Sequence, residues 1–178
     1  MRYRRAETKG GTYFFTVNLA ERQNTLLVDE IDKLRNVMNK VKQQHPYKLD
    51  AMVVLPDHLH VMWTLPSNDN DYATRWMLIK SGFSRQIPKQ ERINKSRKTK
   101  GERGIWQRRY WEHLIRDERD FERRVDYIHY NPVRHGYVER AADWPYSSIH
   151  RFITRGVVSK DWGFGGCHSD EGAYGEMS

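Results

Sequence analysis

The sequence predicts one α+β domain in which an antiparallel sheet carries helices on one face. Three observations favour this class. Segments rich in β-branched and aromatic residues alternate with segments whose apolar residues recur at helical spacing. The pair Pro56-Asp57 suits a tight turn between two adjacent strands. The length of 178 residues is also enough for one domain with a sizeable core.

The predicted elements follow the order strand, helix, strand, strand, helix, strand, which is the order of the ferredoxin-like fold. They are a strand over 12–19, a helix over 28–44, strands over 47–55 and 58–65, a helix over 72–87 and a strand over 105–116. The strand over 58–65 is expected to be central in the sheet. A helix containing Tyr127 and a short helix after Ser147 follow. We expect a single domain over residues 1–155 and a C-terminal tail over 156–178.

Two histidines in the predicted strand over 58–65 indicate a metal site. His58 and His60 flank Leu59, so their side chains emerge on the same face of a strand, one pleat apart. Imidazoles placed in this way can hold one divalent ion while Leu59 packs into the core behind them. The pair alone leaves an alternative open, because two histidines on a half-exposed strand face give the same pattern.

The helix further along the chain carries a candidate nucleophile. Tyr127 lies on one flank of its apolar stripe, together with Asn131 and next to Arg124. Such a position can hold a phenol rigid and still let it reach a substrate, whereas Tyr130 points further toward solvent. Packing is the alternative role for Tyr127, and helix termination before Pro132 is the alternative for Asn131. The apolar stripe is formed by Phe121, Val125 and Ile128.

Six segments, in order along the chain, resemble the REP-associated tyrosine transposases. These are single-tyrosine HUH nucleases (His, hydrophobic residue, His) related to single-strand insertion-sequence transposases. The resemblance extends over about residues 3–155. The matching segments are Gly10–Val17, Val53–His60, Ile105–Gln107 with Tyr110–His113, Val125–Ile128, Asn131–Gly136 and Asp143–Ser148.

The resemblance implies a metal-dependent endonuclease and strand transferase that cuts single-stranded DNA at repetitive extragenic palindrome (REP) hairpins. It implies that Tyr127 is the nucleophile, forming a 5′-phosphotyrosine, and that His58 and His60 bind the catalytic ion. Asn131, one turn beyond Tyr127, would supply an oxygen ligand. Mg²⁺ prefers oxygen ligands and water, and imidazoles shift the preference toward Mn²⁺, so we expect either ion to serve.

Two other classes of protein share part of this pattern. A domesticated hairpin-binding protein that no longer cuts DNA would keep a basic surface, but would not need His58, His60 and Tyr127 together. A zinc hydrolase could use the histidine pair, but the sequence offers no convincing third strong ligand such as a paired carboxylate or a cysteine. A metal-dependent, tyrosine-linked DNA adduct would separate the transposase from both classes.

The charge of the chain predicts a nucleic-acid partner. Lys and Arg total 31 against 23 Asp and Glu, which gives a net charge of +8 and an isoelectric point near 9.6. The segment 91–104 is strongly basic with almost no apolar residue, so we expect a mobile loop there, either a DNA contact or a solvated linker. The amino end interleaves an aromatic residue with arginines, which can bind phosphates and stack on unpaired bases. The predicted DNA-binding residues are Arg2, Tyr3, Arg4, Arg5, Lys95, Arg97, Lys98, Lys100 and Arg124.

Composition also restricts where the protein works. The one cysteine, Cys167, excludes an internal disulfide and a cysteine-based zinc cluster, and fits a reducing cytoplasm. No apolar run approaches the roughly 20 residues needed to span a bilayer, and no signal-peptide core follows the arginine-rich start. We therefore expect a cytoplasmic protein. By the resemblance, it would act as a monomer on DNA hairpins with flanking unpaired bases.

Overall fold

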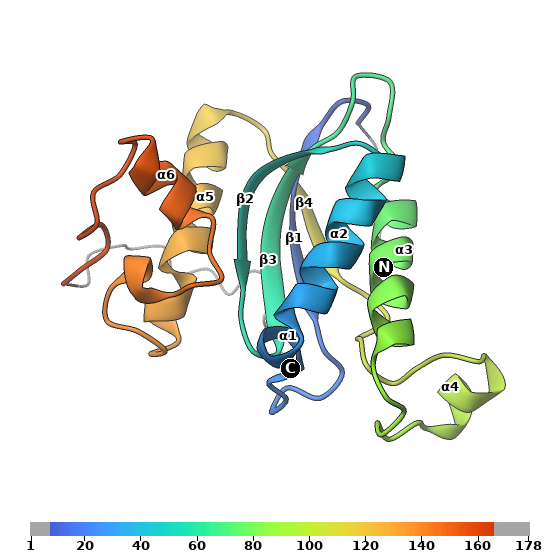
Figure 1. Ribbon diagram of the computed structural model, residues 1–178. Helices are drawn as coiled ribbons and strands as arrows, with labels where there is room; N and C mark the ends of the chain where they lie inside the picture. Colours follow the sequence, from blue (N-terminus) through green and yellow to red (C-terminus); the bar gives the residue numbers. More distant parts are fainter. Residues whose placement is uncertain (1–7, 166–178) are drawn as a thin grey trace.

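The computed structural model describes residues 8–165, and a four-stranded antiparallel sheet is its centre (Figure 1). The strands lie in the spatial order β2-β3-β1-β4, so β1 and β3 are central, as the sequence predicted for the histidine strand. The predicted α+β fold with ferredoxin-like element order is confirmed. The strands are β1 (Thr12–Asn18), β2 (Lys48–Val54), β3 (His58–Thr64) and β4 (Trp111–Leu114).

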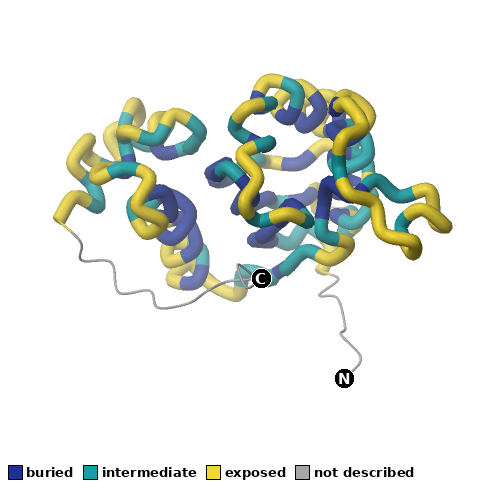
Figure 2. The backbone as a smooth tube through the Cα atoms, turned by 90° about the horizontal axis from the view of Figure 1, so that it is seen from below, coloured by how far each residue is buried: buried dark blue, intermediate teal, exposed yellow. Residues whose placement is uncertain are grey.

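One face of the sheet is covered by the two long helices expected from the sequence, α2 (Ile31–Gln44) and α3 (Tyr72–Gln86). Alternation along β3 sends Leu59, Val61 and Trp63 to this face. The indoles of Trp63 and Trp76 stack there with ring centroids 4.5 Å apart. This face therefore holds the larger of the two apolar cores, and Figure 2 shows the buried residues along the sheet and the facing sides of the helices.

The first predicted helix is interrupted. A short helix α1 (Leu26–Asp29) precedes α2, and Glu30 between them adopts non-helical dihedrals of φ −112° and ψ 31°. The break lets the backbone N–H of Leu27 donate to the carbonyl of Pro56 while the Leu27 side chain enters the core. Helix α1 therefore packs on the turn before β3 and is separate from α2.

The opposite face of the sheet is covered by α5 (Glu118–Arg134), with η1 (Ala141–Asp143) and α6 (Ile149–Thr154) beyond it. The N-terminus of α5 is capped by Asp117, whose carboxylate accepts from the N–H of Asp120. A second apolar core joins α5 to the sheet. Its buried members are Phe14, Ala51, Val53, Leu55, Met62, Val125, Tyr127 and Ile128.

Helix α5 continues past Asn131, so the alternative role of Asn131 as the residue that ends the helix before Pro132 does not hold. Pro132 lies inside the last turn, and the helix ends at Arg134. Gly136, at φ +72°, then turns the chain in the left-handed region that glycine adopts without strain. The backbone N–H groups of His135 and Gly136 close the last turn on the carbonyls of Asn131 and Val133.

Two further expectations needed correction. The basic segment 91–104 is more than a mobile loop, since it contains a short helix α4 (Lys95–Thr99) capped by Asn94. The predicted strand over 105–116 is shorter, because pairing with β1 is confined to Trp111–Leu114 and to a separate bridge between Leu19 and Trp106.

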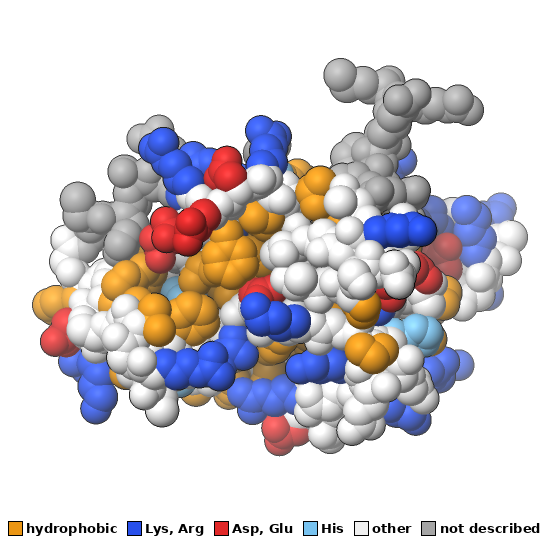
Figure 3. Space-filling model, turned by 90° about the horizontal axis from the view of Figure 1, so that it is seen from above, with side chains coloured by type: hydrophobic (Ala, Val, Ile, Leu, Met, Phe, Trp, Pro, Cys, Tyr) orange, Lys and Arg blue, Asp and Glu red, His pale blue; other side chains and the backbone are white. Residues whose placement is uncertain are grey.

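The surface of the molecule is strongly charged. Figure 3 shows Lys and Arg side chains on several sides of the face seen from above, with Asp and Glu interspersed. Among residues 8–165 there is no helix long and apolar enough to cross a membrane.

Candidate active site

The two histidines of β3 point to the same side of the sheet, as predicted from their spacing. His58 and His60 are both buried, with ring centroids 5.0 Å apart and nearly perpendicular planes. Leu59 between them packs into the core on the other face. A central strand thus presents both imidazoles toward α5 from a rigid support.

Each imidazole is held through its Nδ1 atom. His60 Nδ1 lies 2.8 Å from the hydroxyl of Thr16 on the neighbouring strand. His58 Nδ1 lies 2.6 Å from the carboxylate of Asp57, which is also paired with Arg22 at 3.0 Å. The Nε2 atom of His58, on the other side of its ring, is buried without a hydrogen-bond partner. Metal-binding histidines are commonly oriented by such outer partners.

Burial keeps His58 in a form that can bind a metal. Burial lowers the pKa of His58, more than the hydrogen bond from Asp57 raises it, so the imidazole is neutral at neutral pH. Burial raises the pKa of Asp57, but its contacts with His58 and Arg22 outweigh that effect and the net pKa is lowered. A neutral imidazole against an ionised carboxylate is the arrangement that metal binding requires.

The phenol of Tyr127 lies against this pair. Its ring centroid is 5.2 Å from that of His60 and 6.0 Å from that of Phe14, both edge to face. The guanidinium of Arg134, two turns further along α5, lies 5.3 Å from the centre of the Tyr127 ring. Tyr127 is only 5% exposed, so it is more buried than the half-buried flank position expected from the sequence.

The remaining candidates on α5 have different surroundings. Asn131, on the same flank as Tyr127 and one turn beyond it, is fully buried. Arg124 is buried as well: it pairs with Asp120 at 3.4 Å and lies 5.5 Å from the ring centre of Phe14. We predicted a DNA contact for Arg124, but its place in the interior suits a role in holding α5 to the sheet.

Sequence reasoning missed a row of aromatic rings that begins at the histidine pair. The ring of His135 lies 5.3 Å from that of His58, Tyr137 follows at 6.0 Å, and Trp144 lies 5.3 Å from Tyr137. Tyr137 is 44% exposed. His135 and Trp144 lie in segments of the sequence that resemble the transposase family. That resemblance was the only sign in the sequence that they belong to the site.

The ligands that the protein supplies suit a divalent ion whose coordination shell is completed by substrate. Within residues 8–165, no group of three or more His, Cys, Asp or Glu side chains could hold a metal. Two imidazoles fill only part of the coordination shell of a divalent ion, so phosphate oxygens and water would fill most of the rest. A zinc hydrolase normally supplies three strong protein ligands, and the described part of the chain does not.

The other predicted DNA contacts lie far from this site or outside the described residues. Arg2, Tyr3, Arg4 and Arg5 fall outside the described range. Lys95, Lys98 and Lys100 are exposed on or beside α4, at the other end of the molecule from α5 in Figure 1. Arg97 instead turns inward and donates to two backbone carbonyls, so it shapes the segment around it.

Comparison with known proteins places the chain in a family. Residues 9–131 match the family model described as transposase IS200 like. A REP-associated tyrosine transposase of Escherichia coli K12 is 44% identical over 160 residues, covering 90% of this chain and 89% of its own. A Haemophilus influenzae protein also named for this family is 49% identical over 162 residues, covering 90% of this chain and 92% of its own.

A solved structure shows the same fold over the whole chain. It is a REP-associated tyrosine transposase bound to a REP hairpin, and it matches with a TM-score of 0.85 and 41% sequence identity. The match covers 100% of this chain and 98% of that chain. The chain therefore belongs to the IS200-like transposase family and, within it, to the REP-associated tyrosine transposases.

Proposed function

We propose that the protein is a metal-dependent endonuclease and strand transferase that cuts single-stranded DNA at REP hairpins through a 5′-phosphotyrosine intermediate. The observation that carries this proposal is the contact of Tyr127 with His60, beside a second histidine whose Nε2 atom is buried and unpartnered. The solved relative is bound to a REP hairpin, which supports a hairpin as the substrate.

The proposed chemistry is an in-line transfer of a phosphoryl group. The hydroxyl oxygen of Tyr127 attacks the scissile phosphorus, the bond to the 3′-oxygen breaks, and that oxygen takes up a proton to become a free 3′-hydroxyl. The phenolic proton of Tyr127 is lost in the same step. The phosphodiester energy is kept in the tyrosine ester, so the reverse reaction can rejoin a strand without ATP.

His58, His60 and Asn131 would hold Mg²⁺ or Mn²⁺ at the scissile phosphate. The bound ion supplies charge neutralisation and orientation of the phosphate oxygens. Thr16 and Asp57 fix the imidazoles so that their Nε2 atoms face the ligand.

The helix of the nucleophile belongs to the same chain as the histidines that it meets. Helix α5 packs on its own sheet through the second core, and the contact of Tyr127 with His60 is made within one chain. An arrangement of this kind needs no exchange of helices between partners, which supports our expectation of a monomer.

The central test is formation of a covalent adduct. Single-stranded hairpins with unpaired flanks, taken from the genome that encodes the protein, are incubated with it in Mn²⁺, in Mg²⁺ and in EDTA. We expect an adduct that survives denaturation, forms with either ion and carries the DNA on the 3′ side of the cut. A blunt duplex of the same sequence is the matched control and is expected to be inert.

The alternative function is a hairpin-binding protein that no longer cuts. Such a protein would have the same fold and the same net positive charge. It would bind the hairpin tightly but form no adduct with Mn²⁺, with Mg²⁺ or in EDTA. Adduct formation at the full rate in EDTA would instead contradict the metal requirement, although it would still support the nuclease activity.

A further inference from the structure

A cavity of about 680 Å³ lies between α3 and the segment that follows it. Helix α3 covers the face of the sheet opposite to α5, which carries Tyr127. Six cationic side chains line the cavity, which we call the basic pocket. The one carboxylate in its lining, that of Glu102, is paired with Arg108. Its volume is in the range of pockets that bind small molecules. The lining cations are Lys80, Arg85, Lys89, Arg97, Arg103 and Arg108.

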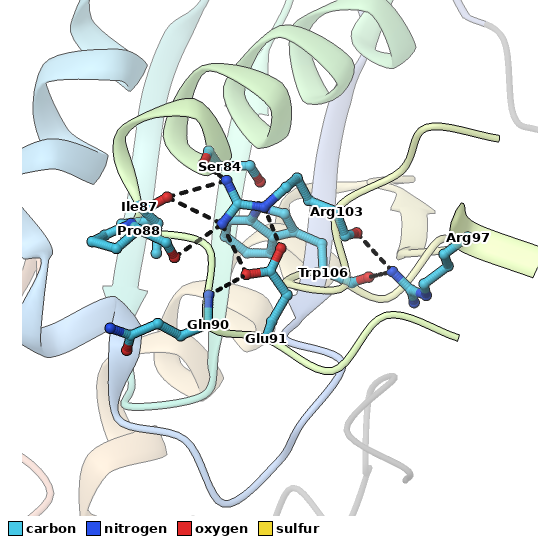
Figure 4. Close-up of polar contacts among 8 residues, drawn as sticks. All are labelled: Ser84, Ile87, Pro88, Gln90, Glu91, Arg97, Arg103 and Trp106. Carbon is cyan, nitrogen blue, oxygen red and sulfur yellow. Dashed lines mark hydrogen bonds and ion pairs between the residues drawn. The ribbon is translucent and has the colours of Figure 1, made fainter. Parts of the chain in front are cut away.

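One wall of the basic pocket is fixed to the end of α3 by Arg103 (Figure 4). Its guanidinium forms an ion pair with Glu91 and donates to the backbone carbonyls of Ser84, Ile87 and Pro88. The hydrogen bond from Arg103 lowers the pKa of Glu91 to about 2, so this pair stays charged. The wall is therefore built into the fold.

Arg97 is pre-oriented by the same segment. Its Nη1 donates to the carbonyls of Arg103 and Trp106, both at 3.0 Å, as Figure 4 shows. No carboxylate in the described chain pairs with Arg97. The Glu102 carboxylate feels the charge of Arg97, but its direct ion pair is with Arg108. A guanidinium without a direct ion pair keeps donors for an anion.

Lys80 is a partly buried cation of the pocket that has no ion pair with a carboxylate. Its Nζ donates to the carbonyl of Gln107 at 2.9 Å and lies 5.1 Å from the ring centre of Tyr110, with no carboxylate partner among residues 8–165. Burial, together with the charge of Arg97, lowers the pKa of Lys80 to about 8. Burying a cation beside another cation is unfavourable unless an anion arrives to pair with it.

We propose that the basic pocket binds a phosphate of the unpaired strand that flanks the hairpin, with Lys80 and Arg97 as the inner contacts and Arg85 and Lys89 at the mouth. A volume of about 680 Å³ suits a ligand of small-molecule size, whereas a duplex is too wide to enter it. This inference rests on the proposed function. Because the pocket lies away from Tyr127, it would anchor the flank of the substrate and leave the scissile phosphate to the histidine site.

The test measures binding without cleavage. Hairpins with and without their unpaired flank are titrated in EDTA against the full chain and against Arg85→Ala, Lys89→Ala and Lys80→Met. Lys40→Ala is the matched control, because Lys40 is exposed on α2 outside the pocket. We expect each pocket variant to weaken binding of the flanked hairpin about tenfold at low salt and to reduce the slope of log K against log salt by about 0.7, the value for one single-strand contact. Lys40→Ala should change neither.

A second measurement does not depend on substitutions. Lysine acylation followed by mass spectrometry compares the labelling of Lys80 near pH 8 in the free and DNA-bound protein. The flanked hairpin should protect Lys80 more than the hairpin alone. The proposal is overturned if the pocket variants behave like Lys40→Ala, or if DNA leaves Lys80 labelling unchanged. Equal loss of binding with flanked and unflanked hairpins would also overturn it, because the contact would then not be with the unpaired flank. Adduct formation by the unaltered protein is scored separately, so failure of the nuclease and failure of the pocket are distinguishable.

Discussion

The imidazole of His60 and the phenol of Tyr127 meet edge to face, with ring centroids 5.2 Å apart and planes inclined by 74°. His60 lies on central strand β3 and Tyr127 on α5, so the contact depends on the packing of that helix against the sheet. Phe14 lies 5.6 Å from His60 and 6.0 Å from Tyr127, so it supports both rings from β1. Tyr127 and the histidine pair are thus brought together by an apolar core.

The first prediction concerns the identity of the nucleophile. Tyr127→Phe should abolish the covalent adduct while hairpin affinity stays within about twofold, because only the hydroxyl is removed from a packed ring. Tyr130→Phe is the matched control, since Tyr130 is on the same helix but only partly buried, and it should keep full adduct formation. Adduct with Tyr127→Phe, and none with Tyr130→Phe, would reverse the assignment.

The second prediction concerns the metal. His58→Ala and His60→Ala should each remove cleavage and should weaken Mn²⁺ binding by at least about tenfold, measured by electron paramagnetic resonance with hairpin present. His45→Ala, at the end of α2, should bind Mn²⁺ normally. Thermal melting of all three proteins checks the fold. Unchanged Mn²⁺ affinity in the two site variants would place the ion elsewhere.

The third prediction concerns a residue that acts through His60. Thr16→Val keeps the shape of a buried side chain but removes the hydroxyl that contacts His60 Nδ1 at 2.8 Å. Metal affinity and cleavage rate should fall about 10–100-fold, the usual effect of losing an outer partner of a metal ligand. Higher Mn²⁺ concentration should restore part of the rate, which a purely structural defect would not allow.

Thr12→Val is the matched control for that experiment. Thr12 is on the same strand, and its hydroxyl contacts Thr64 at 2.8 Å at the other end of the sheet. The two variants remove one hydroxyl each from β1, so equal effects on cleavage would mean that Thr16 acts on the fold alone.

The sequence predicted those parts of the site that depend on the alternation of side chains along one strand or on their spacing along one helix. Strand alternation placed His58 and His60 on one face, and helical spacing placed Tyr127 beside Asn131, because both patterns depend only on neighbouring residues. The approach of Tyr127 to His60 could not be obtained in this way, since it depends on which face of the sheet α5 covers. His135 was missed for the same reason, since its proximity to His58 depends on where the chain goes after α5.

The basic segment shows where composition misleads. Residues 91–104 have the composition of a solvated loop, yet Arg103 donates to a backbone carbonyl of α3 and fixes the segment there. Arg97 donates to the carbonyl of Trp106 and holds the segment together. Gly104 allows a close approach within it, because a Cβ there would lie 2.7 Å from the carbonyl oxygen of Arg92. Arginines that build the wall of a pocket are not distinguishable by composition from arginines that face solvent.

The fourth prediction is a pH dependence of hairpin binding that comes from Lys80. In the free protein its pKa is about 8, and a bound phosphate would raise it, so binding above pH 8 takes up a proton. Affinity for the flanked hairpin should therefore be flat below pH 8 and should fall above it, by at most about tenfold per pH unit.

Lys80→Met should flatten that profile, while Lys89→Ala should weaken binding at every pH without changing its shape. Titration at constant ionic strength over pH 7–9.5 measures both. A profile for Lys80→Met that still falls above pH 8 would show that another group takes up the proton.

The last prediction concerns the aromatic row that begins at the histidine pair. Tyr137 is 44% exposed and lies between His135 and Trp144, so an unpaired base next to the cut could stack on it. Tyr137→Ala should weaken binding of a strand that extends across the cleavage site by about 1–3 kcal/mol, the usual value of one base stacked on an aromatic ring. Tyr137→Phe should bind normally, because stacking needs the ring and not the hydroxyl. A hairpin shortened to end before the cut should be bound equally by all three proteins, whereas a loss there as well would place the effect of Tyr137 on the stem or on the fold.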